Sequence, residues 1–294
     1  MKKSPKEILE EKIFRLTEEY YQLVHSGKEF IPGITKIGYS GRVFDQEDMI
    51  EGIKSILDYW LTSGPFTQKF ENLMKEYFDC SQALLVNSGS SANLLMIASL
   101  CSKNVANHLT KGDEVITPAV TFPTTLTPII QNNLVPVFVD CKPGEYNIDP
   151  NKIEEAITDK TKCIFIPHTV GIPANMDIIT QIANKYNLFL LEDGCDCLGA
   201  KWDGKLLGTF GDMSSISFYP AHHMTMGEGG MVIVNNRLFR KTALSIRDWG
   251  RDCWCEPGNN NTCGKRFDWQ LGELPYGYDH KYIYSNLGYN LKAT

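Results

Sequence analysis

Short apolar runs that alternate with longer helical stretches constrain the fold of this chain more than any other feature. Helices are predicted between the runs at 90–101, 124–132, 150–157 and 175–186. The alternation is typical of an α/β fold with a mostly parallel, seven-stranded sheet flanked by helices. Active sites in such sheets collect at the carboxyl ends of strands. The seven runs are 83–86, 114–118, 135–140, 162–167, 188–193, 214–219 and 230–234.

The two ends of the chain show other patterns. Ser4, Pro5 and Glu7 form a helix start signal, and apolar residues then recur at helical spacing. We expect residues 1–60 to form an N-terminal helical arm and residues 61–294 to form the larger, cofactor-binding domain. A segment from 251 to 280, rich in Cys, Trp, Gly, Asn and Asp, is predicted to be a long irregular loop.

The composition argues against several classes of function. The 294 residues carry a formal net charge of −6 and no long basic run, which is unfavourable for binding nucleic acid. No apolar run approaches the roughly 20 residues that span a bilayer. The N-terminus lacks the apolar core of a signal peptide. We therefore expect a cytoplasmic protein that binds neither nucleic acid nor membrane.

Two predicted strand ends carry features of a binding site. Gly89 permits a tight turn, and Ser90 and Ser91 begin the next helix, where free N–H groups and hydroxyls can bind an anion. Phe122 follows the second run, where its ring can stack on a planar cofactor. The structural alternatives are an ordinary serine-capped helix and a core phenylalanine.

Two further strand ends carry ionisable groups. Asp193 ends the run at 188–193, and a buried carboxylate needs a partner such as a cation, a metal or a protonated ring nitrogen. The structural alternative is that the carboxylate caps a helix or belongs to a buried ion pair. Ser217 lies near the end of the sixth run, and His222 and His223 follow in a loop before Gly-Glu-Gly-Gly. Adjacent histidines are also common on surfaces and in satisfied cores.

Together these features are the parts of a pyridoxal-phosphate site: an anion cradle, a stacking ring, an acid for the pyridine nitrogen and a reactive loop. From about residue 61 onward, the sequence resembles the nucleotide-sugar aminotransferase and dehydrase family, which has the aspartate-aminotransferase fold (fold type I). The family's loop runs Ser-Phe, three residues, Lys, then Thr and Gly-Glu-Gly-Gly. Ser217, Phe218 and Thr225 are in register with it. The resemblance therefore places His222 at the position of the family's Schiff-base lysine.

The resemblance also implies cofactor roles for the other candidates. Asp193 would pair with the pyridine nitrogen, Phe122 would stack on the ring, and the serines would hold the phosphate. Asn290 would reach the phosphate of a neighbouring subunit's site, which implies a homodimer. The residues so assigned are Gly89, Ser90, Ser91, Phe122, Asp193, Ser217 and Asn290.

The histidine implies a reaction other than amino transfer. Without the lysine a transamination cycle stalls, whereas pyridoxamine 5′-phosphate can still form a Schiff base with a keto sugar. His222 would act as general base at the cofactor's C4′ carbon, and a hydroxyl next to the ketone would leave. One branch of the family does this: the 3-dehydrases of 3,6-dideoxyhexose and lipopolysaccharide biosynthesis, such as those acting on CDP-4-keto-6-deoxyglucose. The implied substrate is a nucleotide-linked 4-keto-6-deoxyhexose.

The cysteines resemble one type within that branch, which carries a [2Fe–2S] cluster and has the spacing C-x57-C-x-C-x7-C. Cys195, Cys253, Cys255 and Cys263 have this spacing. Four thiolates suit an iron–sulfur cluster, and they also suit a structural zinc site. The resemblance further implies a partner, a flavin- and iron–sulfur-containing NAD(P)H-dependent reductase that supplies electrons through the cluster.

Several alternatives stay open. Members of the resembled family continue beyond the segment that ends at Thr294 into a small C-terminal domain, so we expect this chain to lack that domain. It could be a truncated remnant that binds cofactor or sugar without catalysis. A cluster-free 3-dehydratase of a GDP sugar, with a structural zinc site, is another alternative. His168, at the end of the fourth run, is a weaker site candidate.

Overall fold

The structure, a computed structural model, describes residues 3–27, 29–38, 41–142, 144–253, 255 and 261–294. The chain divides into two units, Met1–Leu61 and Thr62–Thr294. In the first unit, α1 (Pro5–Val24) contacts α2 (Gln46–Asp58). A capping box starts α1, because the Ser4 hydroxyl accepts the N–H of Glu7 and the Glu7 carboxylate accepts the N–H of Ser4.

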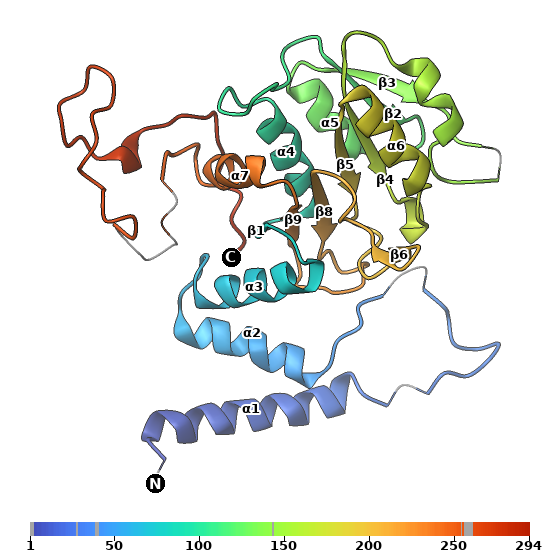
Figure 1. Cartoon of the computed structure of the whole chain (residues 1–294). Helices are drawn as coiled ribbons and strands as arrows, with labels where there is room; N and C mark the ends of the chain where they lie inside the picture. Colours follow the sequence, from blue (N-terminus) through green and yellow to red (C-terminus); the bar gives the residue numbers. More distant parts are fainter. Residues whose placement is uncertain (1–2, 28, 39–40, 143, 254, 256–260) are drawn as a thin grey trace. The chain divides into compact units, whose positions relative to one another are not determined.

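The second unit is built on a seven-stranded sheet (Figure 1). The strand order across the sheet is β1-β9-β8-β5-β4-β2-β3. Strands β2, β3, β4, β5 and β8 are parallel, whereas β9 is antiparallel to both β1 and β8. This confirms the predicted mostly parallel, seven-stranded sheet. The strands are β1 (Gln82–Val86), β2 (Glu114–Pro118), β3 (Val135–Val139), β4 (Thr161–Pro167), β5 (Phe189–Asp193), β8 (Met213–Ser217) and β9 (Gly230–Val234).

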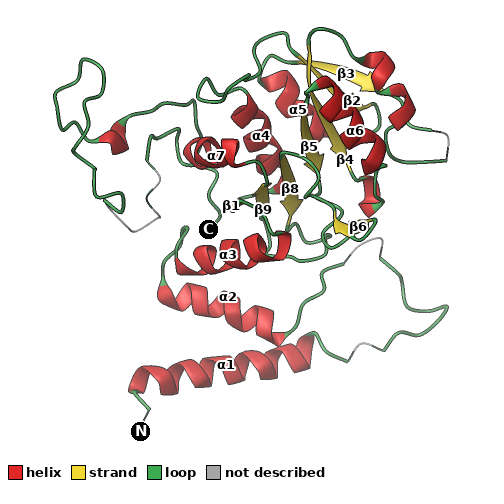
Figure 2. Ribbon diagram, in the orientation of Figure 1, coloured by secondary structure: helices red, strands yellow, loops and turns green. Residues whose placement is uncertain are grey.

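Helices pack on both faces of the sheet (Figure 2). Helices α4 (Gly89–Leu100), α5 (Pro123–Gln131) and α7 (Arg240–Arg247) cover one face, while α3 (Pro65–Phe78) and α6 (Met176–Tyr186) cover the other. Strand side chains point to alternate faces. Leu84 of β1 therefore joins the core under α4, and its neighbour Leu85 joins the core under α3.

Some elements differ from the sequence-based expectation. Helices α3 and α7 and a small hairpin of β6 (Lys201–Trp202) and β7 (Lys205–Leu206) were not predicted, whereas α2 lies within the segment expected to be a helical arm. The helix predicted at 150–157 is wrong: two 3₁₀ turns, η1 (Pro150–Lys152) and η2 (Glu154–Ala156), occupy it. The backbone becomes extended at Ile157, so the segment is too short for a ladder of i to i−4 bonds.

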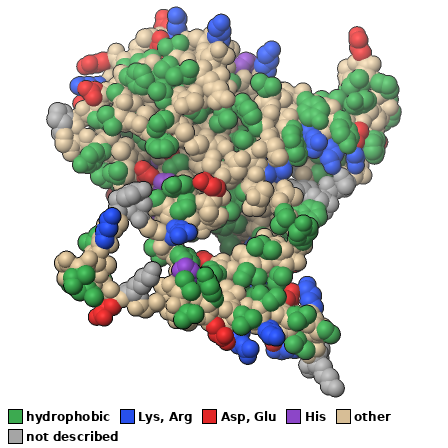
Figure 3. Space-filling model, turned by 180° about the vertical axis from the view of Figure 1, so that it is seen from behind, with side chains coloured by type: hydrophobic (Ala, Val, Ile, Leu, Met, Phe, Trp, Pro, Cys, Tyr) green, Lys and Arg blue, Asp and Glu red, His purple; other side chains and the backbone are tan. Residues whose placement is uncertain are grey.

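The described residues from 251 to 279 contain no helix or strand, as predicted for the irregular loop. Within the described ranges, no helix has the length and apolar character needed to cross a membrane. Lys and Arg side chains are spread over the face shown in Figure 3, with Asp and Glu side chains among them.

Candidate active site

The carboxyl ends of β1, β2, β5 and β8 meet at one edge of the sheet. Strands β2, β5 and β8 end there because they run parallel to one another in the sheet, with β4 between β2 and β5. Strand β1 ends there too, because both it and β8 are antiparallel to β9, which lies between them. The segments that follow these four strands carry the predicted serines, Phe122, Asp193 and the His222 loop, so the topology brings these segments to one edge.

Asp193 is the most strongly bonded side chain at this edge. It is buried, and its Oδ2 atom accepts hydrogen bonds from the Asn93 amide (2.7 Å) and the Thr125 hydroxyl (2.6 Å). Its Oδ1 atom accepts bonds from the Ser215 hydroxyl (3.1 Å) and the Cys195 N–H (3.3 Å). All four partners donate, so both oxygens of Asp193 serve as acceptors. Such a group suits the protonated nitrogen of a pyridine ring.

The start of α4 forms the predicted turn. Ser88, which sequence reasoning missed, is the N-cap: its hydroxyl accepts the N–H of Ser91 (3.0 Å). Ser90 and Ser91 lie in the first turn, where N–H groups have no partner within the helix. A Cβ atom on Gly89 would lie 2.7 Å from both the Cys195 Sγ and the Ser217 Cβ. The close packing at position 89 therefore requires glycine. Separately, the N–H groups in the first turn of α4 are donors suited to a phosphate.

The loop from Tyr219 to Gly229 is closed at its base. Ser217 pairs with Gly230 in the register of β8 and β9, and a Cβ atom on Gly230 would lie 2.2 Å from the carbonyl carbon of Ser88. Phe218 is buried and packs on Phe70, with ring centroids 5.2 Å apart. The base of the loop is thus held against the start of α4.

His222 lies on this loop beside a carboxylate. Its Nδ1 atom is 3.3 Å from Oδ1 of Asp196, and its side chain is 21% exposed. A carboxylate only accepts, so a hydrogen on Nδ1 would face Asp196 and the lone pair of the ring would then lie on Nε2. This geometry suits a general base acting through Nε2. Sequence reasoning missed Asp196, although it lies only three residues after Asp193.

Phe122 and Asn290 occupy different surroundings. Phe122 is the N-cap of α5 and 68% exposed, three residues before Thr125, whose hydroxyl bonds to Asp193. Its ring is therefore free for a ligand near that carboxylate. Asn290 is exposed, and its backbone forms an isolated antiparallel β-bridge with Asp248. The carbonyl of the next residue, Leu291, accepts the N–H of Asn87 (2.8 Å). The role of Asn290 toward a second subunit stays a prediction.

The structure does not bring the four predicted cysteine ligands together. The Cys195 Sγ lies 3.6 Å from the Ser215 hydroxyl, beside Asp193, and burial raises the pKa of this thiol well above its usual range. Cys255 accepts a hydrogen bond from Thr262 (3.1 Å), and the Cys263 Sγ lies 3.6 Å from Nε2 of His280. Within the described ranges, no three His, Cys, Asp or Glu side chains are grouped closely enough to hold a metal ion. As arranged here, the four thiols do not fit one cluster.

His168 has a structural environment. It is buried, its Nδ1 accepts the N–H of Ala174 (3.2 Å), and its Nε2–H therefore donates to Glu192 (3.1 Å). Glu192 also accepts the backbone N–H groups of Gly208, Phe210 and Gly211 at 2.7–2.8 Å. These bonds fix the loop before β8, so His168 is a poor candidate for contact with a substrate.

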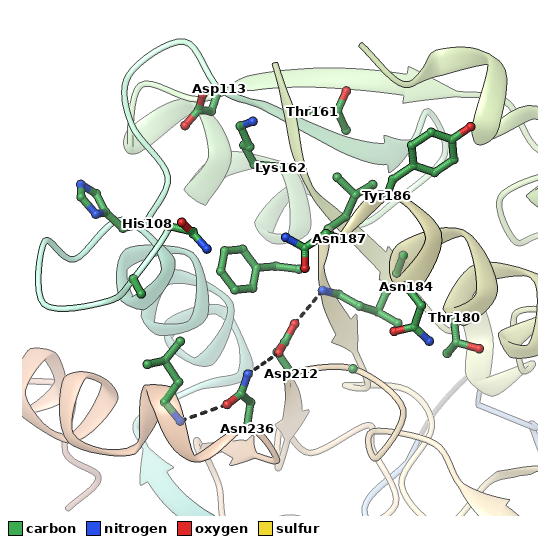
Figure 4. Close-up of a pocket in the computed structure, with 18 of the residues that line it drawn as sticks. His108, Asp113, Thr161, Lys162, Thr180, Asn184, Tyr186, Asn187, Asp212 and Asn236 are labelled. Atoms are coloured by element: carbon green, nitrogen blue, oxygen red, sulfur yellow. Dashed lines mark hydrogen bonds between the residues drawn. The ribbon is translucent and has the colours of Figure 1, made fainter. Parts of the chain in front are cut away.

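A cavity of about 830 Å³ lies where β4 and β5 begin, at the amino ends of the strands (Figure 4). Its lining includes His108, Lys162, Asn184 and Asp212 and none of the predicted site residues. Asp212 is occupied within the fold, since it accepts the N–H of Leu190 (2.9 Å) and the amide of Asn236 (2.7 Å). The cavity is thus separate from the candidate active site.

Comparison with known proteins places this arrangement in a family. The profile of the DegT/DnrJ/EryC1/StrS aminotransferase family matches residues 44–290. The chain belongs to this family. The resemblance seen in the sequence is thereby confirmed at the family level.

The most similar curated relatives include two bacterial proteins. The lipopolysaccharide biosynthesis protein RfbH of Salmonella typhimurium is 50% identical over 287 residues, which are 97% of this chain and 66% of that protein. The dTDP-4-dehydro-2,6-dideoxy-D-glucose 3-dehydratase of Saccharopolyspora spinosa is 49% identical over 275 residues, which are 93% of this chain and 60% of that protein. This chain thus spans less than two thirds of either relative.

A solved structure gives the same fold. The Escherichia coli GDP-4-keto-6-deoxy-D-mannose-3-dehydratase with bound hydrated PLP superimposes with a TM-score of 0.73 at 32% identity, covering 88% of this chain and 65% of that one. The second unit of this chain therefore has the fold of fold type I PLP-dependent enzymes.

Proposed function

We propose that this chain carries the active site of a pyridoxamine-phosphate-dependent 3-dehydratase of a nucleotide-linked 4-keto-6-deoxyhexose. The observation that carries the proposal is His222. By the register of the sequence it would stand at the loop position of the family's lysine. The Asp196 carboxylate, 3.3 Å from Nδ1, would favour the tautomer with the lone pair on Nε2. An imidazole in this state can remove a proton, but it cannot replace the lysine amine.

Each side chain at the strand ends has a task in this proposal. When bound, pyridoxamine 5′-phosphate supplies an amine that condenses with the sugar's keto group and a ring that accepts electrons. Asp193 would hold the ring nitrogen, and the start of α4 with Ser217 would hold the phosphate. Phe122 would cover one face of the ring. His222 would take a proton at Nε2 and return it to the departing 3-hydroxyl.

The names of the relatives support the reaction type. The Saccharopolyspora spinosa protein is a dTDP-sugar 3-dehydratase, and the Escherichia coli protein is a GDP-sugar 3-dehydratase. These two differ in the nucleotide, so the proposal names the sugar chemistry and leaves the nucleotide open. The Salmonella typhimurium relative belongs to lipopolysaccharide biosynthesis, and we propose the same setting here.

A histidine pair provides the test. His222→Asn should slow exchange of the cofactor's C4′ hydrogen with solvent deuterium by about 100-fold or more, because a general base contributes that much. The cofactor dissociation constant should stay unchanged. His223→Asn is the matched control, since the exposed neighbour has no assigned role. Wild-type exchange rates in His222→Asn would disprove the proposal.

The iron–sulfur part of the proposal is supported by the cysteine spacing in the sequence. No group of three or more His, Cys, Asp or Glu side chains in the described part of the chain is arranged to hold a metal ion. A second candidate is therefore a cluster-free 3-dehydratase. Anaerobic purification followed by iron, sulfide and zinc analysis distinguishes them. Two irons and two sulfides per chain would support the cluster and its reductase partner; their absence would support the second candidate.

The assembly and location are proposals as well. A homodimer follows from the predicted role of Asn290, which is exposed in the single chain. Light scattering after size-exclusion chromatography would reveal it, and a monomer would remove that role. We also propose a cytoplasmic location, on the sequence features given above.

A further inference from the structure

The carboxylate of Asp193 has no acceptor position left for a cofactor. A carboxylate offers about four lone-pair positions, two on each oxygen. Asn93 and Thr125 donate to Oδ2, while Ser215 and the Cys195 N–H donate to Oδ1. A protonated ring nitrogen needs one of these positions. One of the four donors must therefore leave when a pyridine ring binds.

The two donors on Oδ1 are fixed by the sheet. Ser215 is paired directly with Asp193 in the register of β5 and β8, and its side chain is fully buried. The Cys195 N–H is a backbone group two residues after Asp193 at the end of β5. The Cys195 N–H cannot withdraw without a shift of the backbone. The Ser215 hydroxyl can rotate, but the nearest alternative acceptor is the Cys195 Sγ at 3.6 Å, and a thiol sulfur accepts only weakly.

For Asn93, which donates to Oδ2 of Asp193, giving up its hydrogen bond is also energetically unfavourable. It is fully buried, and within the described part of the chain its Oδ1 atom has no hydrogen-bond partner. If its amide nitrogen lost Asp193 as well, the whole buried amide would be left unpaired, which is costly.

Thr125 has an alternative partner close at hand. It lies in the first turn of α5, and its backbone N–H already donates to the carbonyl of Phe122 (3.0 Å). A threonine hydroxyl in a helix can rotate about χ1 to bond the carbonyl three or four residues earlier. A carbonyl oxygen has two lone pairs, so the Phe122 carbonyl can accept this second bond.

We propose that Thr125 is a placeholder for the cofactor ring nitrogen. In the empty site its hydroxyl occupies Oδ2 of Asp193, and on binding it rotates to the backbone and yields that position to the ring N–H. The inference rests on the cofactor proposed above. Thr125 then competes with the cofactor, because its bond to a carboxylate in the empty site is stronger than its bond to a neutral carbonyl in the loaded site.

The competition gives an unusual expectation for a variant. Thr125→Val keeps the side-chain shape but cannot bond Asp193, so it should bind pyridoxamine 5′-phosphate about three- to tenfold more tightly than the wild type. The cofactor-free variant should melt at a lower temperature, because Asp193 loses a donor. Thr125→Ser keeps the hydroxyl and should bind like the wild type.

Calorimetric titration of the whole chain with pyridoxamine 5′-phosphate, with melting curves of the free and loaded forms, tests this. Thr117→Val is the matched control: Thr117 is fully buried near the end of β2, and its hydroxyl has no partner among the described residues. Its affinity should match the wild type. Thr125→Ala serves as the second variant if Thr125→Val does not fold.

The outcomes separate this inference from the proposed function. Weaker or unchanged binding by both Thr125→Val and Thr125→Ala would overturn the placeholder role and leave the cofactor assignment standing. A wild-type chain that binds neither pyridoxamine nor pyridoxal 5′-phosphate would overturn both. Tighter binding by the variants that lack the hydroxyl, with the serine variant unchanged, would establish the exchange.

Discussion

The Nδ1 atom of His222 lies 3.3 Å from the Oδ1 atom of Asp196. The two residues come from loops that follow neighbouring strands, β8 and β5. In the proposed mechanism, this contact favours a hydrogen on Nδ1 and so leaves Nε2 to act as the base.

Asp196→Ala should slow C4′ hydrogen exchange by about tenfold, a loss smaller than removing the general base itself. The loss should be moderate because the Asp196 side chain is 47% exposed and water can replace it. Cofactor affinity should stay unchanged, since Asp196 acts through His222. Asp196→Asn can still accept from Nδ1–H and should restore much of the rate. Equal losses in both variants would rule out a positioning role.

Gly89→Ala should destabilise the chain by roughly 1–3 kcal/mol, because its Cβ would lie 2.7 Å from side-chain atoms of Cys195 and Ser217. Urea unfolding measures this difference. Gly52→Ala is the control, since no atom lies within 4 Å of its Cβ position in α2. A stable Gly89→Ala variant with normal cofactor affinity would show that the crevice is not closely packed.

Glu192→Gln should cost about 3 kcal/mol of folding stability, because the new NH₂ group would face a hydrogen-bond donor on either side. Both carboxylate oxygens are occupied: one by the N–H groups of Phe210 and Gly211, the other by Gly208 and His168. Glu155→Gln, an exposed change, should have almost no effect on chemical denaturation. Similar unfolding midpoints for the two variants would contradict this assignment.

Cys101 should make the fold sensitive to alkaline pH. Burial raises the pKa of its thiol to about 12, whereas an unfolded thiol titrates near 9. The unfolded chain therefore loses this proton first, and stability should fall as the pH rises from about 9 toward 12. Melting temperatures across this range should decline less steeply for Cys101→Ala. An identical slope in the variant would show that other groups carry the alkaline loss.

The strands were predictable because each is a short apolar run, and apolar runs of this length reflect burial on both faces of a sheet. Helix α3 was missed although its signals are local: Pro65 at its first turn and Phe70, Met74 and Phe78 at helical spacing. That error lay in the interpretation. The helical spacing at 150–157 predicts one helix, but the chain forms two short 3₁₀ turns there and becomes extended at Ile157.

Only those residues of the candidate site whose position follows from the strand pattern of the sequence were predictable. Asp193 and Ser217 end strands, and that can be read from the run itself. The bonds of Asp193 to Thr125 and Asn93 join residues 68 and 100 positions away, so they depend on how the helices dock. The cysteines show the reverse case. Their spacing matches a pattern, yet the described residues contain no group of three or more potential metal ligands.

The pairing of Ser217 with Gly230, which closes the loop between β8 and β9, bears on how such a protein can evolve. The anchoring contacts are made by Ser217, Phe218 and Gly230, none of which is the reactive residue. If His222 is the reactive residue as proposed, a substitution at position 222 would alter the chemistry of the loop while its attachment to the sheet is preserved. The scaffold can thus explore new reactions through single codon changes, with little selection against them on grounds of folding.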